Sequence, residues 1–233
     1  MTQARQICRW HLQVDAQALA RAVAAEILRA AGEAVAGRGA FHLVLAGGNT
    51  PRRVYELLRH AQAGGSGWHV WFGDERCLPP DDPERNSRMA AEAWLDHVAI
   101  PPQQIHVIPA ELGATAAATA YAGMLAGVGD FDLVLLGLGE DGHTASLFPG
   151  HTWGAEPGAP DVLPVFDAPK PPPDRVSLSV SRLSAARQVI FLVSGAGKRP
   201  VVAAWHSGAA LPAAAIAAGA GVDVHLDFAL PEY

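Results

Sequence analysis

Hydrophobic positions along this chain form short apolar runs, separated by longer stretches that have the spacing of helices. Short apolar runs are typical of strands buried on both faces of a sheet. We expect strands at 41–46, 68–72, 105–108, 131–136, 162–166, 176–180, 189–193 and 222–228. We expect helices at 15–36, 84–97, 115–126 and 199–206, and one more after the turn at 47–51. This alternation predicts an α/β fold with a Rossmann-like, open and mostly parallel sheet and helices on both faces.

Four of the predicted strands end in turns that carry glycine or charge. The turns are Gly47-Gly48-Asn49-Thr50-Pro51, Gly73-Asp74-Glu75-Arg76, Gly137-Leu138-Gly139-Glu140-Asp141-Gly142-His143 and Ser194-Gly195-Ala196-Gly197-Lys198. We place Thr50 as the N-cap of the following helix and Pro51 at its first position. Ligands bind outside the carboxyl ends of parallel strands, so we expect the four turns to converge on one pocket.

Composition fits a globular α/β protein and excludes several classes of partner. The 233 residues are 50% hydrophobic and 17% charged, which suits one domain covering residues 1–233. A formal net charge of −6 gives no reason to expect nucleic acid or an anionic membrane. The uncharged span 200–222 is rejected as a membrane helix because it contains Pro212, His206 and many small residues.

Cysteine usage and the N-terminus point to a reducing compartment. Cys8 and Cys77 are the only cysteines and form no C-x-x-C pair, so neither a disulfide framework nor a zinc ribbon is expected. The first 13 residues contain no apolar run of the kind that a secretory signal needs. We therefore expect a cytoplasmic protein, and the oligomeric state stays open.

The turn at 137–143 places a carboxylate and an imidazole two residues apart at a strand end. An imidazole can take and return a proton near neutral pH, and a carboxylate can fix its tautomer. Asp141 and His143 are therefore candidate catalytic residues. The turn also satisfies G-x-G-x-x-G, but no long helix follows it and no acidic residue ends the next strand, which disfavours a dinucleotide site. A metal site with His151 has weak support, and a tight turn without chemistry remains an alternative.

Two of the turns suit a phosphate. Gly47 and Gly48 expose backbone N–H groups ahead of a helix N-terminus, where an anion meets oriented donors. The turn at 194–198 adds the cation Lys198, although it is not a Walker A loop because Leu192 and Arg199 break that pattern. The cluster at 74–76 suits a sugar hydroxyl, a phosphate clamp or internal salt bridges, and the sequence does not separate these. No G-x-S-x-G elbow of a serine hydrolase is present.

The ordered segments LAGGNTP, FGDERCLPPDDPERNS, LLGLGEDGHTASLFPGH and FLVSGAGKRP resemble the 6-phosphogluconolactonase family, within the larger group that includes glucosamine-6-phosphate deaminase. The resemblance spans nearly the whole chain. It implies hydrolysis of 6-phospho-D-glucono-1,5-lactone, a step of the oxidative pentose phosphate pathway, without a metal or organic cofactor. The partner that it implies is this small-molecule sugar-phosphate lactone.

The resemblance also implies roles for individual residues. His143 would be the general base that activates water, and Asp141 would support it or hold sugar hydroxyls. The phosphate would lie between the 47–51 backbone, Arg76 and Lys198. The substrate-binding set as a whole is Gly47, Gly48, Asn49, Thr50, Asp74, Arg76, Gly139 and Lys198, with Arg175 or Arg182 as further contributors.

Two alternatives stay open. In the deaminase branch a glutamate follows the D-G-H segment, whereas this chain has Ser146-Leu147-Phe148-Pro149, and Arg76 stands where that branch typically has tyrosine. Both differences count against a deaminase. Within the lactonase pattern itself, the segment 84–87 departs from the expected order, which puts contacts from that loop in doubt. The other alternative is a sugar-phosphate sensor without catalysis, but the residues before the first predicted helix are too few for a helix-turn-helix.

Overall fold

The computed structural model describes residues 6–230, and its main feature is a seven-stranded sheet in the order β1-β10-β9-β6-β2-β3-β5. All neighbouring strands pair in parallel. In order across the sheet the strands are β1 (Cys8–Leu12), β10 (Val222–Leu226), β9 (Ala186–Val193), β6 (Phe131–Gly137), β2 (Phe41–Leu45), β3 (Trp68–Phe72) and β5 (Ile105–His106). The predicted α/β fold with a parallel sheet is confirmed.

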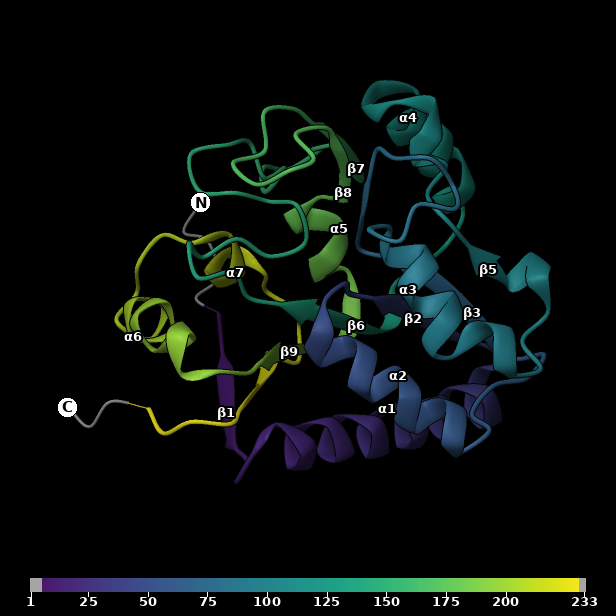
Figure 1. Ribbon diagram of the computed structural model, residues 1–233, viewed down its shortest axis with the longest axis horizontal. Helices are drawn as coiled ribbons and strands as arrows, with labels where there is room; N and C mark the ends of the chain where they lie inside the picture. Colours follow the sequence, from purple (N-terminus) through teal and green to yellow (C-terminus); the bar gives the residue numbers. More distant parts are fainter. Residues whose placement is uncertain (1–5, 231–233) are drawn as a thin grey trace.

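Helices cover both faces of this sheet (Figure 1). They are α1 (Ala16–Arg38), α2 (Asn49–His60), α3 (Asn86–Ala93), α4 (Ala114–Leu125), α5 (Val180–Ser184), α6 (Arg199–His206) and α7 (Pro212–Ala215), with 3₁₀ turns η1 (Leu95–His97), η2 (Pro102–Gln104), η3 (Ala110–Leu112) and η4 (Ala196–Lys198). Helices α1 and α2 lie below the sheet in the view of Figure 1, and α5 lies above it. Among residues 6–230, none of the helices has the length and apolarity needed to cross a bilayer.

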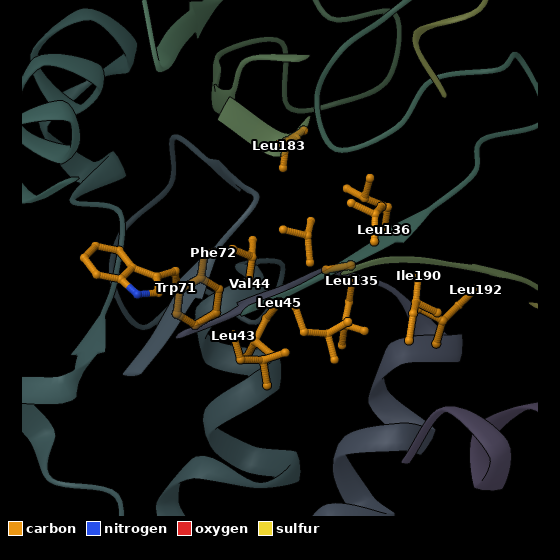
Figure 2. Close-up of a cluster of buried hydrophobic side chains, with 14 of the residues drawn as sticks. Leu43, Val44, Leu45, Trp71, Phe72, Leu135, Leu136, Leu183, Ile190 and Leu192 are labelled. Atoms are coloured by element: carbon orange, nitrogen blue, oxygen red, sulfur yellow. The ribbon is translucent and has the colours of Figure 1, made fainter. Parts of the chain in front are cut away.

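The core forms because side chains alternate between the two faces of each strand. Figure 2 shows Leu43 and Leu45 of β2 on one face and Val44 on the other, the side on which Leu183 of α5 lies. All four side chains are buried. Strands covered on both faces therefore read as continuous apolar runs, which is the pattern seen at 41–46 and 131–136.

The chain changes direction across the sheet between β2 and β6. From β2 it moves outward through β3 to β5, and then returns to the other side of β2 as β6, followed outward by β9. Connections that leave in opposite directions open a crevice at the carboxyl ends of the two central strands. The turns after β2 and β6 flank this crevice.

A second, three-stranded antiparallel sheet was not expected. It pairs β4 (Asp74–Arg76) with β8 (Arg175–Leu178), which in turn pairs with β7 (Val162–Val165). Its register places Arg76 opposite Arg175. The charged segment that follows β3 is therefore a strand. Its pairing with β8 brings Arg175, at the end of the proline-rich loop 151–174, to the crevice.

Several sequence expectations need correction. Helix α2 begins at Asn49 with Gly48 as N-cap, so the placement of Thr50 as N-cap and Pro51 at the first position was wrong by two residues. Gly48 has φ 102°, which glycine adopts without strain, and Pro51 is tolerated at the third position because N–H groups there have no partner within the helix. Strand β1 was missed, and the strand expected at 176–180 is present as β8 but ends at Leu178, with Val180 starting α5. Residues 1–5, part of the N-terminal stretch tested for a secretory signal, lie outside the described residues.

Candidate active site

The turns after β2, β3, β6 and β9 line one pocket of about 220 Å³ at the crevice between β2 and β6. The convergence expected from the sequence is thus present. The lining residues are Ala46, Gly47, Gly48, Asp74, Arg76, Asn86, Gly137, Leu138, Gly139, His143, Thr144, Ala145, Lys170, Arg175 and Lys198. Cations outnumber carboxylates on this wall, although the chain as a whole is acidic.

Asp141 and His143 form a hydrogen-bonded pair on the β6 side of the pocket. His143 Nδ1 donates to Asp141 Oδ1 at 2.5 Å, and the His143 backbone N–H lies 3.3 Å from the same oxygen. The ring also packs on Phe148, with 4.8 Å between centroids. Because Nδ1 carries the proton that Asp141 accepts, Nε2 keeps its lone pair. This is the tautomer that a general base needs.

Glycine at position 139 makes this pairing possible. A Cβ built there would lie 2.0 Å from His143 Nδ1 and 2.4 Å from Asp141 Oδ1. The turn is closed by the Gly139 N–H, which donates to the carbonyl of His143 at 2.7 Å. Gly139 therefore acts through the space that it leaves for the two side chains.

The environment favours neutral His143 and ionised Asp141. Burial lowers the pKa of His143 below its usual value, and the hydrogen bond and charge of Asp141 offset this only in part. Burial acts to raise the pKa of Asp141, but the hydrogen bonds and charge of His143, together with the charge of Lys170, outweigh it and the net pKa is lowered. At neutral pH the pair is therefore an unprotonated base held by a carboxylate.

Asp74 and Glu75 have separate tasks. Asp74 lines the pocket, and its carboxylate accepts from Ser146 Oγ at 2.6 Å and from Asn86 Nδ2 at 3.0 Å. Glu75 is fully buried and its carboxylate accepts the first N–H groups of α3. The two carboxylates are thus separated by position: Asp74 lies on the pocket wall, and Glu75 lies in the interior.

One corner of the pocket is suited to an anion. Gly47 and Gly48 precede α2, whose first N–H groups have no acceptor within the helix and whose dipole favours negative charge. A Cβ on Gly47 would overlap the Asn86 side chain, so only glycine lets the backbone at position 47 pack this close to Asn86. The Arg76 guanidinium donates to the Glu84 carbonyl, and its buried Nε has no hydrogen-bond partner among residues 6–230.

Lys198 lies on a turn that is tethered by Asp227. The Asp227 carboxylate accepts from Ser194 Oγ at 2.5 Å and from the Gly195 N–H at 2.8 Å. Burial lowers the pKa of Lys198, and Glu140 acts in the opposite direction. The tether gives the 194–198 turn a fixed path from β9 to the pocket.

Some predicted residues lie elsewhere. Asn49 and Thr50 follow the lining glycines but are not lining residues themselves. Arg182 donates to the carbonyls of Val128 and Gly129 and stacks on Phe131, away from the pocket, so its proposed phosphate contact was wrong. His151 packs on Phe148 at 5.9 Å and does not line the pocket either. Within residues 6–230, no three His, Cys, Asp or Glu side chains are grouped as metal ligands.

The sequence reasoning missed Asn86, Lys170 and Asp227. Asn86 was set aside because the order of 84–87 looked unusual, yet its amide joins Asp74 at the pocket wall. Lys170 is the only lysine or arginine within 151–174, and this single cation was the available signal. Asp227 gave no signal, because its contact with the 194–198 turn depends on how β10 pairs with β9.

An open parallel sheet with an Asp–His pair and an anion-suited corner at its switch point is typical of α/β enzymes that act on anionic ligands, and comparison with known proteins identifies the family. Residues 14–225 match the sequence model described as glucosamine-6-phosphate isomerases/6-phosphogluconolactonase, and the chain belongs to this family.

Individual relatives carry the lactonase name. The chain is 41% identical over 221 residues to a 6-phosphogluconolactonase of Mycobacterium bovis, covering 88% of each chain. It is 39% identical over 213 residues to one from Streptomyces coelicolor, covering 84% of this chain and 81% of the relative. The solved 6-phosphogluconolactonase of Thermotoga maritima superposes with a TM-score of 0.86 at 25% identity, over 94% of this chain and 99% of that chain.

Proposed function

We propose that this protein hydrolyses 6-phospho-D-glucono-1,5-lactone to 6-phosphogluconate, the second step of the oxidative pentose phosphate pathway. The observation that carries the proposal is the Asp141–His143 pair, which shares one pocket with a cationic corner fit for a phosphate. The relatives named 6-phosphogluconolactonase, at about 40% identity over most of the chain, support it.

The reaction needs one base and no covalent intermediate. His143 Nε2 takes a proton from water while the water oxygen bonds to the lactone C1, and the carbonyl electron pair moves onto its oxygen. The tetrahedral species then collapses, the bond from C1 to the ring oxygen breaks, and the ring oxygen receives the proton from His143. The carboxylic acid that forms releases a proton to solvent. Asp141 stabilises the imidazolium between the two transfers.

Phosphate binding would orient the lactone for this attack. In the proposal the phosphate lies against the N-terminus of α2, Arg76 and Lys198, and the support for this is that Gly47, Gly48, Arg76 and Lys198 all line the pocket. Binding energy from a group that does not react can hold the carbonyl close to the base. Asp74 faces the same space and is assigned to sugar hydroxyls.

A deaminase-type isomerase is the second candidate, because the family description covers both activities. Residues 146–149 supply no carboxylate: Ser146 donates to Asp74, and Phe148 packs against His143. These contacts favour hydrolysis over ring opening with amine release.

The deciding experiment measures turnover of freshly generated 6-phosphogluconolactone, corrected for spontaneous hydrolysis, beside ammonia release from glucosamine-6-phosphate, both with EDTA present. Lactone hydrolysis alone in EDTA supports the proposal, including its independence from an easily removed metal. Ammonia release alone would move the assignment to the deaminase branch. Binding of 6-phosphogluconate without either activity would indicate a sensor. A cytoplasmic location stays a prediction.

A further inference from the structure

Lys170 extends from the proline-rich loop to the rim of the pocket, beside the proposed base. Its Nζ lies 3.9 Å from Asp141 Oδ2, the oxygen that His143 does not use. About half of the Lys170 side chain is exposed, and the residue lines the pocket. Its positive charge also acts to lower the pKa of His143, whose ring is hydrogen-bonded to the same Asp141.

The backbone of this lysine is held in place although its side chain is not. Arg175 Nη2 donates to the carbonyls of Lys170 and Pro171 at 2.8 and 3.1 Å, and Arg175 Nε donates to the carbonyl of Pro172 at 3.0 Å. Arg175 itself is buried and packs against Phe148, the ring that also supports His143. One buried guanidinium therefore fixes the distance between the Lys170 backbone and the base.

The position of Lys170 matters because of where charge develops in the reaction. A water activated by His143 attacks a carbonyl carbon that must lie within a few ångströms of the imidazole, so the carbonyl oxygen becomes an oxyanion in the same region. The ion pair with Asp141 keeps the Lys170 ammonium in this region. Because the ammonium carries three N–H groups, it can pair with Asp141 and still donate a hydrogen bond to the oxyanion.

On the basis of the proposed function, we infer that Lys170 is a catalytic residue that stabilises the oxyanion formed at the lactone carbonyl. The carbonyl electron pair moves onto oxygen as water adds, the ammonium donates a hydrogen bond to that oxygen, and the pair returns as the ring C–O bond breaks. Lys170 keeps its proton throughout. Arg175 is a positioning residue in this scheme, because its Nε and Nη2 donate to the loop that carries Lys170.

The phosphate has other partners. The N-terminus of α2 and the Arg76 guanidinium, with its unpartnered Nε, provide the anion corner. Lys198 reaches the pocket from the opposite turn, after β9. A phosphate contact is made equally in the ground and transition states and changes KM, whereas an oxyanion contact is made in the transition state and changes kcat. The two lysines are therefore separable by kinetics.

The test compares Lys170→Met with Lys198→Met in steady-state hydrolysis of the phosphorylated lactone across pH, with inorganic phosphate as a competing anion. For Lys170→Met we expect the pH-independent plateau of kcat to fall by about 10²-fold, the scale for one lost oxyanion donor, with KM and inhibition by phosphate nearly unchanged. Lys170→Arg should recover part of the loss. Lys198→Met should raise KM and weaken inhibition by phosphate at near-normal kcat.

Other outcomes would overturn the inference. A raised KM with a normal kcat in Lys170→Met would make Lys170 a phosphate ligand. A plateau that is unchanged, with only the acid limb moved to higher pH, would make it a modulator of His143. Thermal unfolding of each variant identifies any loss due to folding, and Lys170→Gln repeats the comparison if the Met variant is unstable. If the wild-type protein does not hydrolyse the lactone, the proposed function fails first.

Discussion

The centre of this site depends on the side chains of Asp141 and His143 and on the lack of a side chain at Gly139. His143 and Asp141 meet at 2.5 Å only because residue 139 has no Cβ. Such a requirement is steric, and it explains why a glycine follows the strand at a point where no positive φ is needed. The chemistry of the pocket therefore depends on a residue that has no side chain.

Replacing His143 by alanine should lower kcat by about 10²-fold or more with little change in KM, because the variant loses the proposed base but keeps the anion corner. His151→Ala is the matched control, since that ring packs on the same Phe148 but does not line the pocket. Steady-state kinetics with fresh lactone measures both. Near-normal kcat in His143→Ala would remove His143 from the mechanism.

The pH dependence of kcat/KM tests the environment of the same histidine. The base works when unprotonated, so activity falls as the pH drops through the pKa of His143, which burial places below its usual value of 6.5. We therefore expect the acid limb below about pH 6.5. In Asp141→Asn the carboxylate that raises this pKa is lost, so the limb should move to still lower pH while kcat falls. An acid limb at or above pH 6.5 in the wild-type protein would contradict this assignment.

At the scale of elements, helix α3 shows how a strand can cap a distant helix. Glu75 of β4 accepts the N–H groups of Asn86 and Ser87 at 2.7 and 2.8 Å, and Arg85 Nε lies 3.5 Å from the same carboxylate. No side chain local to α3 caps its N-terminus. The contact holds Asn86, and therefore the Asn86 amide beside Asp74, at the pocket wall.

Glu75→Gln should destabilise the protein by about 2–4 kcal/mol, because a buried carboxylate that accepts backbone N–H groups and faces Arg85 is replaced by a neutral amide. Glu92→Gln on the same helix is the control. Its ion pair with Arg88 is exposed on both sides, so we expect a change of about 0.5 kcal/mol or less. Urea unfolding measures the loss in the free energy of unfolding for both variants. Equal losses would show that Glu75 contributes no more to stability than the exposed Glu92.

At the scale of the whole molecule, the features that follow from local pattern were predictable and those that depend on distant pairing were not. The apolar runs of β2, β3, β6 and β9 predict buried parallel strands, and the glycine-containing turns that follow them predict a shared pocket. The small sheet gave no such signal, since β4 is Asp-Glu-Arg and its partner β8 lies about 100 residues away in the sequence.

The same division holds for the site. Residues on turns after parallel strands, such as His143, Gly47 and Lys198, were found from the sequence because strand ends meet at one edge. Lys170 and Asn86 reach the pocket through the β4–β8 pairing and through the Glu75 cap, both of them contacts between segments far apart in the chain. The periodicity of the local sequence does not indicate such contacts, because they form only when segments far apart in the chain pair in the folded protein.

A row of histidines across the sheet predicts how the stability of the whole molecule depends on pH. His42, His69 and His106 stack in sequence on β2, β3 and β5, with centroids 4.7 and 5.6 Å apart. Burial and mutual repulsion lower the pKa of His106 to about 4, and burial lowers the pKa of the other two. Asp132, whose carboxylate accepts the His42 backbone N–H, offsets the shift at His42 in part.

The unfolded chain therefore binds more protons than the folded protein between about pH 6.5 and 4, and the free energy of unfolding should fall as the pH drops through this window. His106→Phe keeps an aromatic ring beside Trp71 but cannot take a charge. We expect it to reduce the loss of stability between pH 8 and 4.5 by about 1 kcal/mol, an amount discounted because the ring is only half-buried. Asp223, whose pKa is lowered to about 2, loses its contribution only below this range. Urea unfolding at both pH values measures the difference, and identical losses in the wild-type protein and the variant would show that His106 binds protons equally in the folded and unfolded states.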